Sequence, residues 1–176
     1  MSLSMFFTVM IVSMNSYIIF DFPNNSDILG WTIVDDNVMG GKSFSTLKVN
    51  SEGFGVFEGR ISLKNNGGFS SLRYRFKRLS IIKRTKIIIK LRGDGNKYQF
   101  RIKSNSSDYY TYISNFVTSG DWQEIVIPLE DMYPSYRGRK IDKPHFSNEY
   151  IEEIGFLIGN EKEEHFKLLI EKIVLE

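Results

Sequence analysis

The fold is decided by residues 85–103, TKIIIKLRGDGNKYQFRIK. In the second half of this stretch Tyr98, Phe100 and Ile102 alternate with polar residues, so an extended chain carries its apolar side chains on one face. The first half, 85–91, repeats the pattern with isoleucine and leucine. Between the halves lies Gly-Asp-Gly-Asn, residue types that adopt the positive φ angles of tight turns. The stretch therefore predicts two half-buried β-strands joined by a hairpin turn.

The rest of the chain repeats this alternation, and no window of about eleven residues or more shows the apolar spacing of an amphipathic helix. Many short strands at close intervals are typical of a sandwich or jelly roll. We therefore expect one all-β domain of about ten antiparallel strands. The further expected strands are 18–22, 44–49, 56–63, 69–76, 109–117, 122–129, 151–158 and 166–175.

Turns rich in glycine, asparagine or serine separate the expected strands. The longest irregular stretch, 130–148, holds two prolines and one glycine, and we expect it to be a surface loop that crosses between the two sheets. The turns lie at 65–68, 93–96, 104–108, 119–121 and 159–160.

Composition limits the classes of function. The chain has 176 residues, enough for one domain, and 41% of them are hydrophobic. The formal net charge of +2 is too small to supply the basic field that nucleic-acid-binding proteins use. Cysteine is absent, which excludes disulfides, thiolate nucleophiles and thiolate metal sites. We therefore expect no nucleic-acid partner.

Residues 1–18 form an apolar extension before the expected domain at 19–176. The run Met5–Val12 and the small polar residues after it are typical of a short secretory signal, but the positive charge that precedes such signals is missing. The alternatives are a start site upstream of a natural start at Met14, an added leader, or an apolar strand or short helix packed on the domain. No run approaches the roughly 18 apolar residues of a membrane span, and no Arg-rich transit peptide is visible. We expect a cytoplasmic location, or a secreted or periplasmic one if 1–16 is a signal.

Three features resemble catalytic or metal-binding signatures. The sequence GGKS at 40–43 imitates the end of a phosphate-binding loop, but that motif requires glycine at the position of Asp36. His145 and His165 lie outside any nucleophile or metal signature. Asp35 with Asp36 could ligate calcium, although adjacent carboxylates at a turn are usually solvated. We therefore predict a non-catalytic protein without a cofactor or metal.

The strand phases place a set of polar residues opposite the core, across one sheet. Phe69 shares the phase of Arg73, and arginine beside an exposed aromatic ring is typical of a recognition surface. Arg60, Phe69, Arg73 and Arg101 are therefore candidates for binding a partner or ligand. The alternative is an ordinary solvated sheet face. The full set is Glu58, Arg60, Ser71, Arg73, Arg101, Lys103 and Glu124.

Several segments, taken together and in this order, resemble the complex I intermediate-associated protein 30 family. The similarity covers roughly residue 19 to the C-terminus. The segments are Trp31 followed by DNVMGGKS at 36–43, FEG at 57–59, NGGFSSLR at 66–73, RGDG at 92–95 with Tyr98, Trp122 with IP at 127–128, YRGR at 136–139 and IGF at 154–156.

This resemblance implies a galactose-binding-like jelly-roll β-sandwich related to carbohydrate-binding modules. It also implies an assembly factor or chaperone whose protein partner is an assembly intermediate of respiratory complex I, NADH:ubiquinone oxidoreductase. The chain departs from the family pattern in lacking a transit peptide, which weakens the assembly role, and in lacking the Gly-Pro often found before Phe166. The alternative function is a carbohydrate-binding module with a glycan ligand.

The family motifs also predict how two glycine-rich loops are held. Paired glycines at 40–41 and 67–68, that is Gly40, Gly41, Gly67 and Gly68, permit positive φ angles or a close backbone approach. We expect carboxylate–guanidinium pairs to brace these loops, since such pairs provide several hydrogen bonds per residue. The arginines could instead present their guanidinium groups to a sugar or an acidic partner. The expected cluster comprises Asp36, Arg73, Arg92 and Asp94.

Overall fold

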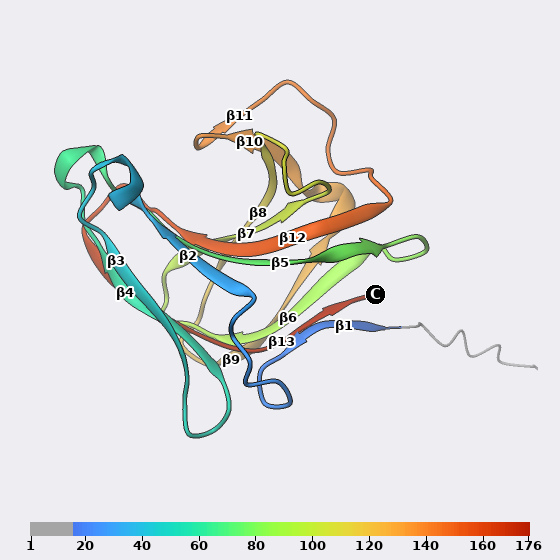
Figure 1. Ribbon diagram of the computed structural model, residues 1–176, viewed down its shortest axis with the longest axis horizontal. Helices are drawn as coiled ribbons and strands as arrows, with labels where there is room; N and C mark the ends of the chain where they lie inside the picture. Colours follow the sequence, from blue (N-terminus) through green and yellow to red (C-terminus); the bar gives the residue numbers. More distant parts are fainter. Residues whose placement is uncertain (1–15) are drawn as a thin grey trace, which may run out of the picture.

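Two antiparallel β-sheets face each other in the computed structural model, which describes residues 16–176 (Figure 1). The first sheet has the strand order β3 (Phe44–Val49), β4 (Gly55–Ile61), β13 (Glu164–Leu175), β6 (Lys86–Arg92) and β9 (Trp122–Pro128), and β1 (Tyr17–Asp21) pairs with the end of β13. The second sheet has the order β11 (Arg139–Lys140), β10 (Tyr133–Tyr136), β8 (Thr111–Val117), β7 (Lys97–Lys103), β12 (Tyr150–Ile158), β5 (Ser70–Ser80) and β2 (Trp31–Asp35).

The core lies between the sheets and is built from the alternating apolar side chains. Tyr98 and Phe100 of β7 are fully buried, as are Ile87 and Ile89 of β6. Phe156 of β12 meets Phe100 edge-on, with 5.3 Å between ring centroids. The all-β fold and the inward phases of these strands are therefore confirmed.

Three strands were not expected from the sequence. β2 pairs with β5, and β10 and β11 lie inside 130–148, where a loop was predicted. The loop prediction is therefore wrong for these short segments, one of which contains Pro134. Proline cannot donate a ladder hydrogen bond, so its presence lowers the strand signal of the sequence. The same stretch does cross between the sheets, because it leads from β9 of the first sheet to β10 of the second.

The turn at 93–96 does not close a hairpin. β6 pairs with β13 and β9 in the first sheet, whereas β7 pairs with β12 and β8 in the second. The turns at 65–68, 119–121 and 159–160 also lead from one sheet to the other. Among the five expected turns only 104–108 joins two paired strands, β7 and β8. The hairpin predicted for 85–103 is therefore wrong, although both of its strands are present.

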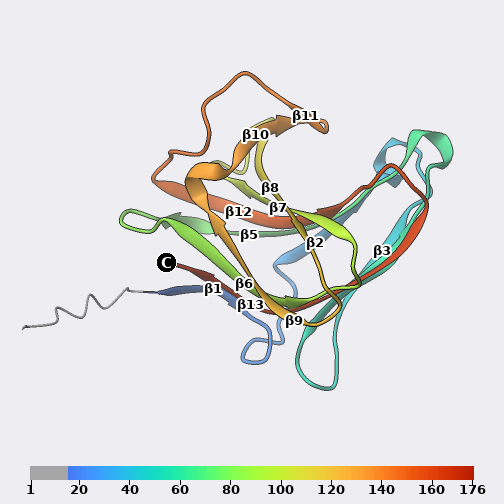
Figure 2. The ribbon, with the colours of Figure 1, turned by 180° about the vertical axis from the view of Figure 1, so that it is seen from behind.

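Three short 3-10 helices lie within the described part of the chain: η1 (Asp36–Met39), η2 (Lys64–Asn66) and η3 (Leu129–Asp131). The first two lie together at one end of the sandwich, beside the outer face of the second sheet, as Figures 1 and 2 show. Within residues 16–176 no helix is long and apolar enough to cross a membrane. The apolar run Met5–Val12 lies outside the described residues, and β1 begins at Tyr17, two residues before the predicted domain boundary.

Candidate binding groove

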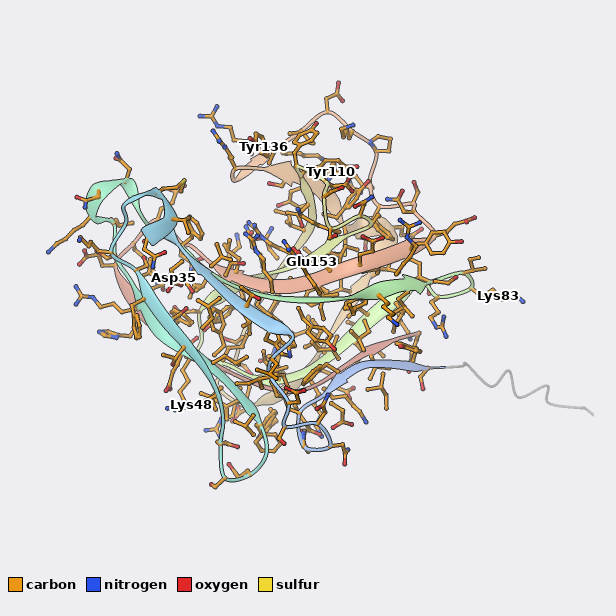
Figure 3. All side chains as sticks on the ribbon, viewed as in Figure 1. Asp35, Lys48, Lys83, Tyr110, Tyr136 and Glu153 are labelled. Atoms are coloured by element: carbon orange, nitrogen blue, oxygen red, sulfur yellow. The ribbon has the colours of Figure 1, made fainter. Side chains whose placement is uncertain are left out.

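A groove of about 700 Å³ lies on the outer face of the second sheet. We call it the concave groove. Its floor is formed by β5, β12 and β7, one wall by Tyr109, Tyr110, Tyr136 and Arg137, and the other by Met39 of η1 with Gly68 and Phe69. Figure 3 shows Glu153 on the floor, with Tyr110 and Tyr136 on the wall that β8 and β10 build above it. The groove is therefore a product of the sheet's curvature and of the stretch 130–148.

The floor is organised in rows that run across three strands. In the central row Gly155 of β12 pairs with Arg73 of β5 on one side and with Arg101 of β7 on the other. Because Gly155 has no side chain, the space between the two arginines is open to both of them. A Cβ at Gly155 would lie 2.6 Å from the carbonyl oxygen of Leu72, so the close packing of β5 against β12 requires glycine here.

Neither central arginine has a carboxylate partner among the described residues. Arg101 donates from Nε and Nη2 to Oε1 of Gln99, at 3.1 and 2.7 Å. Arg73 donates from Nε to Oγ of Ser71 at 3.4 Å. Burial, and secondly the proximity of Arg73, lower the pKa of Arg101 to about 10, so the guanidinium stays charged at neutral pH. Two positive charges therefore share the centre of the groove, and no side-chain carboxylate of residues 16–176 pairs with either of them.

The next row holds the one buried carboxylate of the floor. Glu153 accepts a hydrogen bond from Nε of Arg75 at 2.6 Å, while its side chain is only 8% exposed. Lys103 pairs with Glu153 across the strands and donates from Nζ to the backbone oxygen of Asp108. Burial lowers the pKa of Lys103, and the nearby Glu153 opposes this shift. This row therefore sets one carboxylate against two positive charges, whereas the arginine row beside it holds no carboxylate.

The wall presents tyrosine rings to solvent. Tyr109 is 63% exposed and Tyr136 is 38% exposed, and their rings meet edge-on with 5.3 Å between centroids. Arg137 lies over the ring of Tyr136 at 5.3 Å. Tyrosine gives large contact area and a hydroxyl at low entropy cost, so it is enriched in binding surfaces. An arginine floor beside a tyrosine wall has the composition of a recognition site.

The structure brings together three of the four residues predicted for the binding surface. Phe69, Arg73 and Arg101 all line the concave groove. Arg60 lies instead on β4 of the first sheet, where it lines a shallow depression with Phe44 and His165. The prediction that all four share one sheet is therefore wrong, because strand phase fixes the face of a residue but not its sheet. Glu58 and Glu124 likewise belong to the first sheet.

Asp36 holds the two glycine-rich loops, but it does so without an arginine. Its carboxylate is fully buried and accepts hydrogen bonds from Ser43 N–H at 2.9 Å and from Ser43 Oγ. It also accepts them from Gly68 N–H at 2.6 Å and Phe69 N–H at 3.3 Å. Burial opposes ionisation, but these donors outweigh it and lower the pKa of Asp36.

The carboxylate–guanidinium cluster expected at these loops is not formed. Asp94 accepts hydrogen bonds from the Tyr98 hydroxyl at 3.0 and 3.1 Å and from Lys167 N–H at 2.7 Å. Arg92 donates to the backbone oxygen of Gly120 at 3.0 Å. No hydrogen bond or ion pair within residues 16–176 joins Asp36 or Asp94 to Arg73 or Arg92. Backbone amides and hydroxyls, and not guanidinium groups, therefore hold these carboxylates.

The residues considered for metal binding and catalysis have structural contacts. Asp35 accepts hydrogen bonds from Ser45 N–H of β3 at 3.0 Å and from Ser70 Oγ of β5 at 2.6 Å, so its carboxylate joins two strands, whereas that of Asp36 joins two loops. His145 is exposed and lies 3.1 Å from the backbone oxygen of Glu130. Within the described residues no group of three or more histidine, aspartate or glutamate side chains is placed to hold a metal ion.

The sequence reasoning missed the tyrosine wall and Glu153. Tyr136 and Arg137 stand in the family motif YRGR, which was identified without a site being assigned to it. Tyr109 and Tyr110 form an aromatic pair beside an expected turn, which is a detectable signal. Glu153 gave no signal, since only the pairing of β12 with β5 and β7 places it on the groove floor.

Comparison with solved structures identifies the fold of the chain. The chain is similar to the family 11 carbohydrate-binding module of a cellulosomal cellulase of Clostridium thermocellum, with a TM-score of 0.70 and 18% identity over 91% of this chain and 93% of that one. A second structure of a family 11 module from the same organism, in complex with a β-1,3-1,4-mixed-linked tetrasaccharide, gives a TM-score of 0.68 and 18% identity, covering 91% and 94%. At this identity the similarity shows the galactose-binding-like β-sandwich fold alone.

The sequence comparison is more specific. The chain is 26% identical over 148 residues to the mitochondrial complex I intermediate-associated protein 30 of Drosophila melanogaster, which is 72% of this chain and 50% of that protein. The chain thus spans half the length of this relative. The family model of complex I intermediate-associated protein 30 matches residues 20–170. The chain therefore belongs to the complex I intermediate-associated protein 30 family.

Proposed function

We propose that this chain is a non-catalytic binding module that holds a segment of a protein partner in the concave groove, and that the partner is an assembly intermediate of respiratory complex I. The observation that carries the proposal is the groove itself, which has exposed tyrosines on its wall and, on its floor, two arginines that pair with no carboxylate of residues 16–176. The name of the Drosophila relative supports the choice of partner.

A binding role fits the chemistry of the groove better than catalysis does. General acid–base chemistry requires a positioned group with a free proton or lone pair near a reacting atom. Glu153, the carboxylate on the groove floor, is already held by Arg75 at 2.6 Å. Asp35 and Asp36 each accept several hydrogen bonds and are buried, Asp35 against two strands and Asp36 against two loops. The groove therefore offers recognition groups and no ready acid–base pair among its described residues.

Affinity capture from the native source tests the proposal. The tagged chain and its variant Tyr136→Ala are compared, with Phe44→Ala as control because Phe44 is 66% exposed on the outer face of the first sheet. Wild type and Phe44→Ala are expected to enrich the same complex I subunits, and Tyr136→Ala to lose them. Enrichment of no protein by wild type, or capture unaffected by Tyr136→Ala, contradicts the proposal.

A carbohydrate-binding role is the second candidate, and the similarity of the groove-bearing fold to a module solved with a tetrasaccharide favours it. Aromatic rings that line the groove, such as those of the exposed Tyr109 and the half-buried Phe69, are the residue type that packs against the apolar face of a pyranose. A glycan array tests this role with wild type and Phe69→Ala. Binding that is lost in Phe69→Ala supports it, whereas absence of binding, or binding unaffected by the substitution, excludes it.

A further inference from the structure

The centre of the concave groove is a site of uncompensated positive charge built into the sheet. Arg73 and Arg101 stand on either side of Gly155 in one row, two strand spacings apart, which is about 10 Å between their α-carbons. Both side chains are longer than half this distance, and nothing projects from Gly155 between them. Their side-chain hydrogen bonds within residues 16–176 go to neutral groups, the Gln99 amide and the Ser71 hydroxyl.

The charge of the lining makes an anionic occupant favourable. The basic residues of the lining outnumber its carboxylates, and one of those carboxylates, Glu153, is already paired. A carboxylate between Arg73 and Arg101 would accept charge-assisted hydrogen bonds from both guanidinium groups and would offset the repulsion between their positive charges. The lining residues with charge are Arg73, Arg101, Lys103, Arg137, Glu153 and Glu161.

We propose that Arg73 and Arg101 form a carboxylate-binding site at the centre of the groove, and that its occupant is an acidic side chain of an extended polypeptide segment. The choice of a polypeptide rests on the proposed function and on the spacing of the floor. Consecutive rows lie two residues apart along each strand, about 7 Å, which is also the spacing between same-face side chains of an extended peptide. A segment lying along the strands places one carboxylate at the arginine row and its next same-face side chain at the row of Lys103.

The tyrosine wall completes the site. Tyr109 and Tyr136 stand beside the floor with exposed ring area, and Arg137 covers one ring face. They offer contact to the backbone and apolar atoms of a bound segment, while the arginines fix its register. The specificity of the site therefore comes from charge at the centre and from contact area at the wall.

Fluorescence anisotropy with a defined probe tests the site. The probe is a fluorescein-labelled, end-capped peptide of alternating Glu and Ser, and the matched probe has Gln in place of Glu. We expect wild type to bind the Glu probe at least about tenfold more tightly than the Gln probe, in a salt-dependent manner. Arg73→Gln and Arg101→Gln should each weaken binding of the Glu probe by about tenfold, and Arg101→Lys by less because it keeps the charge.

Arg60→Gln is the matched control, since Arg60 is an exposed arginine on the other sheet and forms no ion pair within residues 16–176. It should bind as wild type does. Thermal unfolding of each variant shows whether it is folded, and if Arg101→Gln unfolds, Arg73→Gln carries the test because its Nε contacts only Ser71. Equal binding of the two probes, or unchanged binding in folded Arg73→Gln, overturns the proposal.

Two further outcomes separate this inference from the proposed function. Capture of complex I subunits by wild type and Arg73→Gln alike leaves the proposed function standing and overturns the carboxylate site. Arg73-dependent binding of the Glu probe without capture of any subunit supports the site and contradicts the proposed partner. Binding of polygalacturonate that depends on Arg73, without binding of the Glu probe, overturns the polypeptide assignment in favour of an acidic saccharide.

Discussion

The carboxylate of Asp36 lies against the α-carbon of Gly41, so closely that a methyl group on Gly41 would overlap both the carboxyl carbon and one of its oxygens. The next glycine upstream, Gly40, meets no such obstacle, since a Cβ there would have no heavy atom within 4 Å. Gly40 instead has a φ angle of 88°, in the left-handed region. Neighbouring glycines of one motif thus serve different purposes, one of them steric and the other conformational.

Substitution of these two glycines should separate the two purposes. Gly41→Ala displaces the Asp36 carboxylate from its donors and should lower the free energy of unfolding by about 2–4 kcal/mol. Gly40→Ala forces alanine into the left-handed backbone conformation and should lower the free energy of unfolding by about 1 kcal/mol. Gly40→Asn should lower it by less, because asparagine tolerates this conformation. Urea unfolding followed by circular dichroism measures all three. Equal effects of the two alanine substitutions would contradict the steric role of Gly41.

Asp36→Asn should make stability less dependent on acid pH. The amide cannot match the carboxylate as an acceptor for Ser43, Gly68 and Phe69, so the free energy of unfolding at pH 7 should fall by about 2–3 kcal/mol. The pKa of Asp36 is lowered in the folded state. Its ionised form therefore contributes stability fully above the unfolded value of about 3.9, and this contribution is lost as the pH falls through the folded value.

The difference between wild type and Asp36→Asn should therefore shrink as the pH is lowered from 5 towards the folded pKa of Asp36. Taking the difference removes the contributions of Asp21 and Glu58, whose pKa values are also lowered. Urea unfolding at a series of pH values gives the result. Asp121→Asn is the control, because Asp121 is exposed and its carboxylate accepts no hydrogen bond in the described part of the chain, and it should change stability by less than about 0.5 kcal/mol. A difference that stays constant with pH would contradict an ionised, bracing Asp36.

Much of the fold could be predicted from the local pattern of apolar residues, but this pattern carries no information about which strands pair. Alternation identified the inward face of β6 and β7 because side-chain direction has period two. It could not assign a strand to a sheet, since that depends on partners far away in sequence, as in the pairing of β2 with β5. Because the sheet of each strand was unknown, Arg60 was wrongly predicted to lie beside Arg73 and Arg101. For the same reason the sequence did not show that Gly155 lies between Arg73 and Arg101.

Tyr98→Phe and Asp94→Ala should be energetically coupled. Burial and the nearby Asp94 raise the pKa of the Tyr98 phenol, which therefore remains a proton donor to Asp94 at neutral pH. Asp94 in turn accepts from Lys167 N–H, which ties the turn after β6 to β13. Tyr98→Phe should cost about 1–1.5 kcal/mol, and Asp94→Ala about 2–3 kcal/mol because it also removes the acceptor of Lys167 N–H. A double-mutant cycle should give a coupling of about 1 kcal/mol. Arg92 was predicted to be a partner of Asp94, but the structure shows no hydrogen bond or ion pair between them, so Arg92→Ala should change the free energy of unfolding by less than about 0.5 kcal/mol. Additive effects of Tyr98→Phe and Asp94→Ala would contradict the hydrogen bond between Tyr98 and Asp94.

Glu153→Gln should lower stability and strengthen binding at the same time. The substitution leaves Arg75 without its carboxylate partner, which should lower the free energy of unfolding by about 1–3 kcal/mol. It also removes a negative charge one row, or about 7 Å, from the centre of the arginine row. At that distance the repulsion of a bound carboxylate is about 0.6 kcal/mol in a water-like dielectric, so the Glu probe should bind about threefold more tightly. Glu124→Gln changes the net charge equally but lies exposed on the first sheet, and it should leave the affinity unchanged. General damage to the groove would lower both stability and affinity. Lower stability in the unfolding measurement together with tighter binding in the anisotropy measurement would therefore show that the charge of Glu153 weakens binding at the arginine row. Weaker binding by Glu153→Gln would contradict this role.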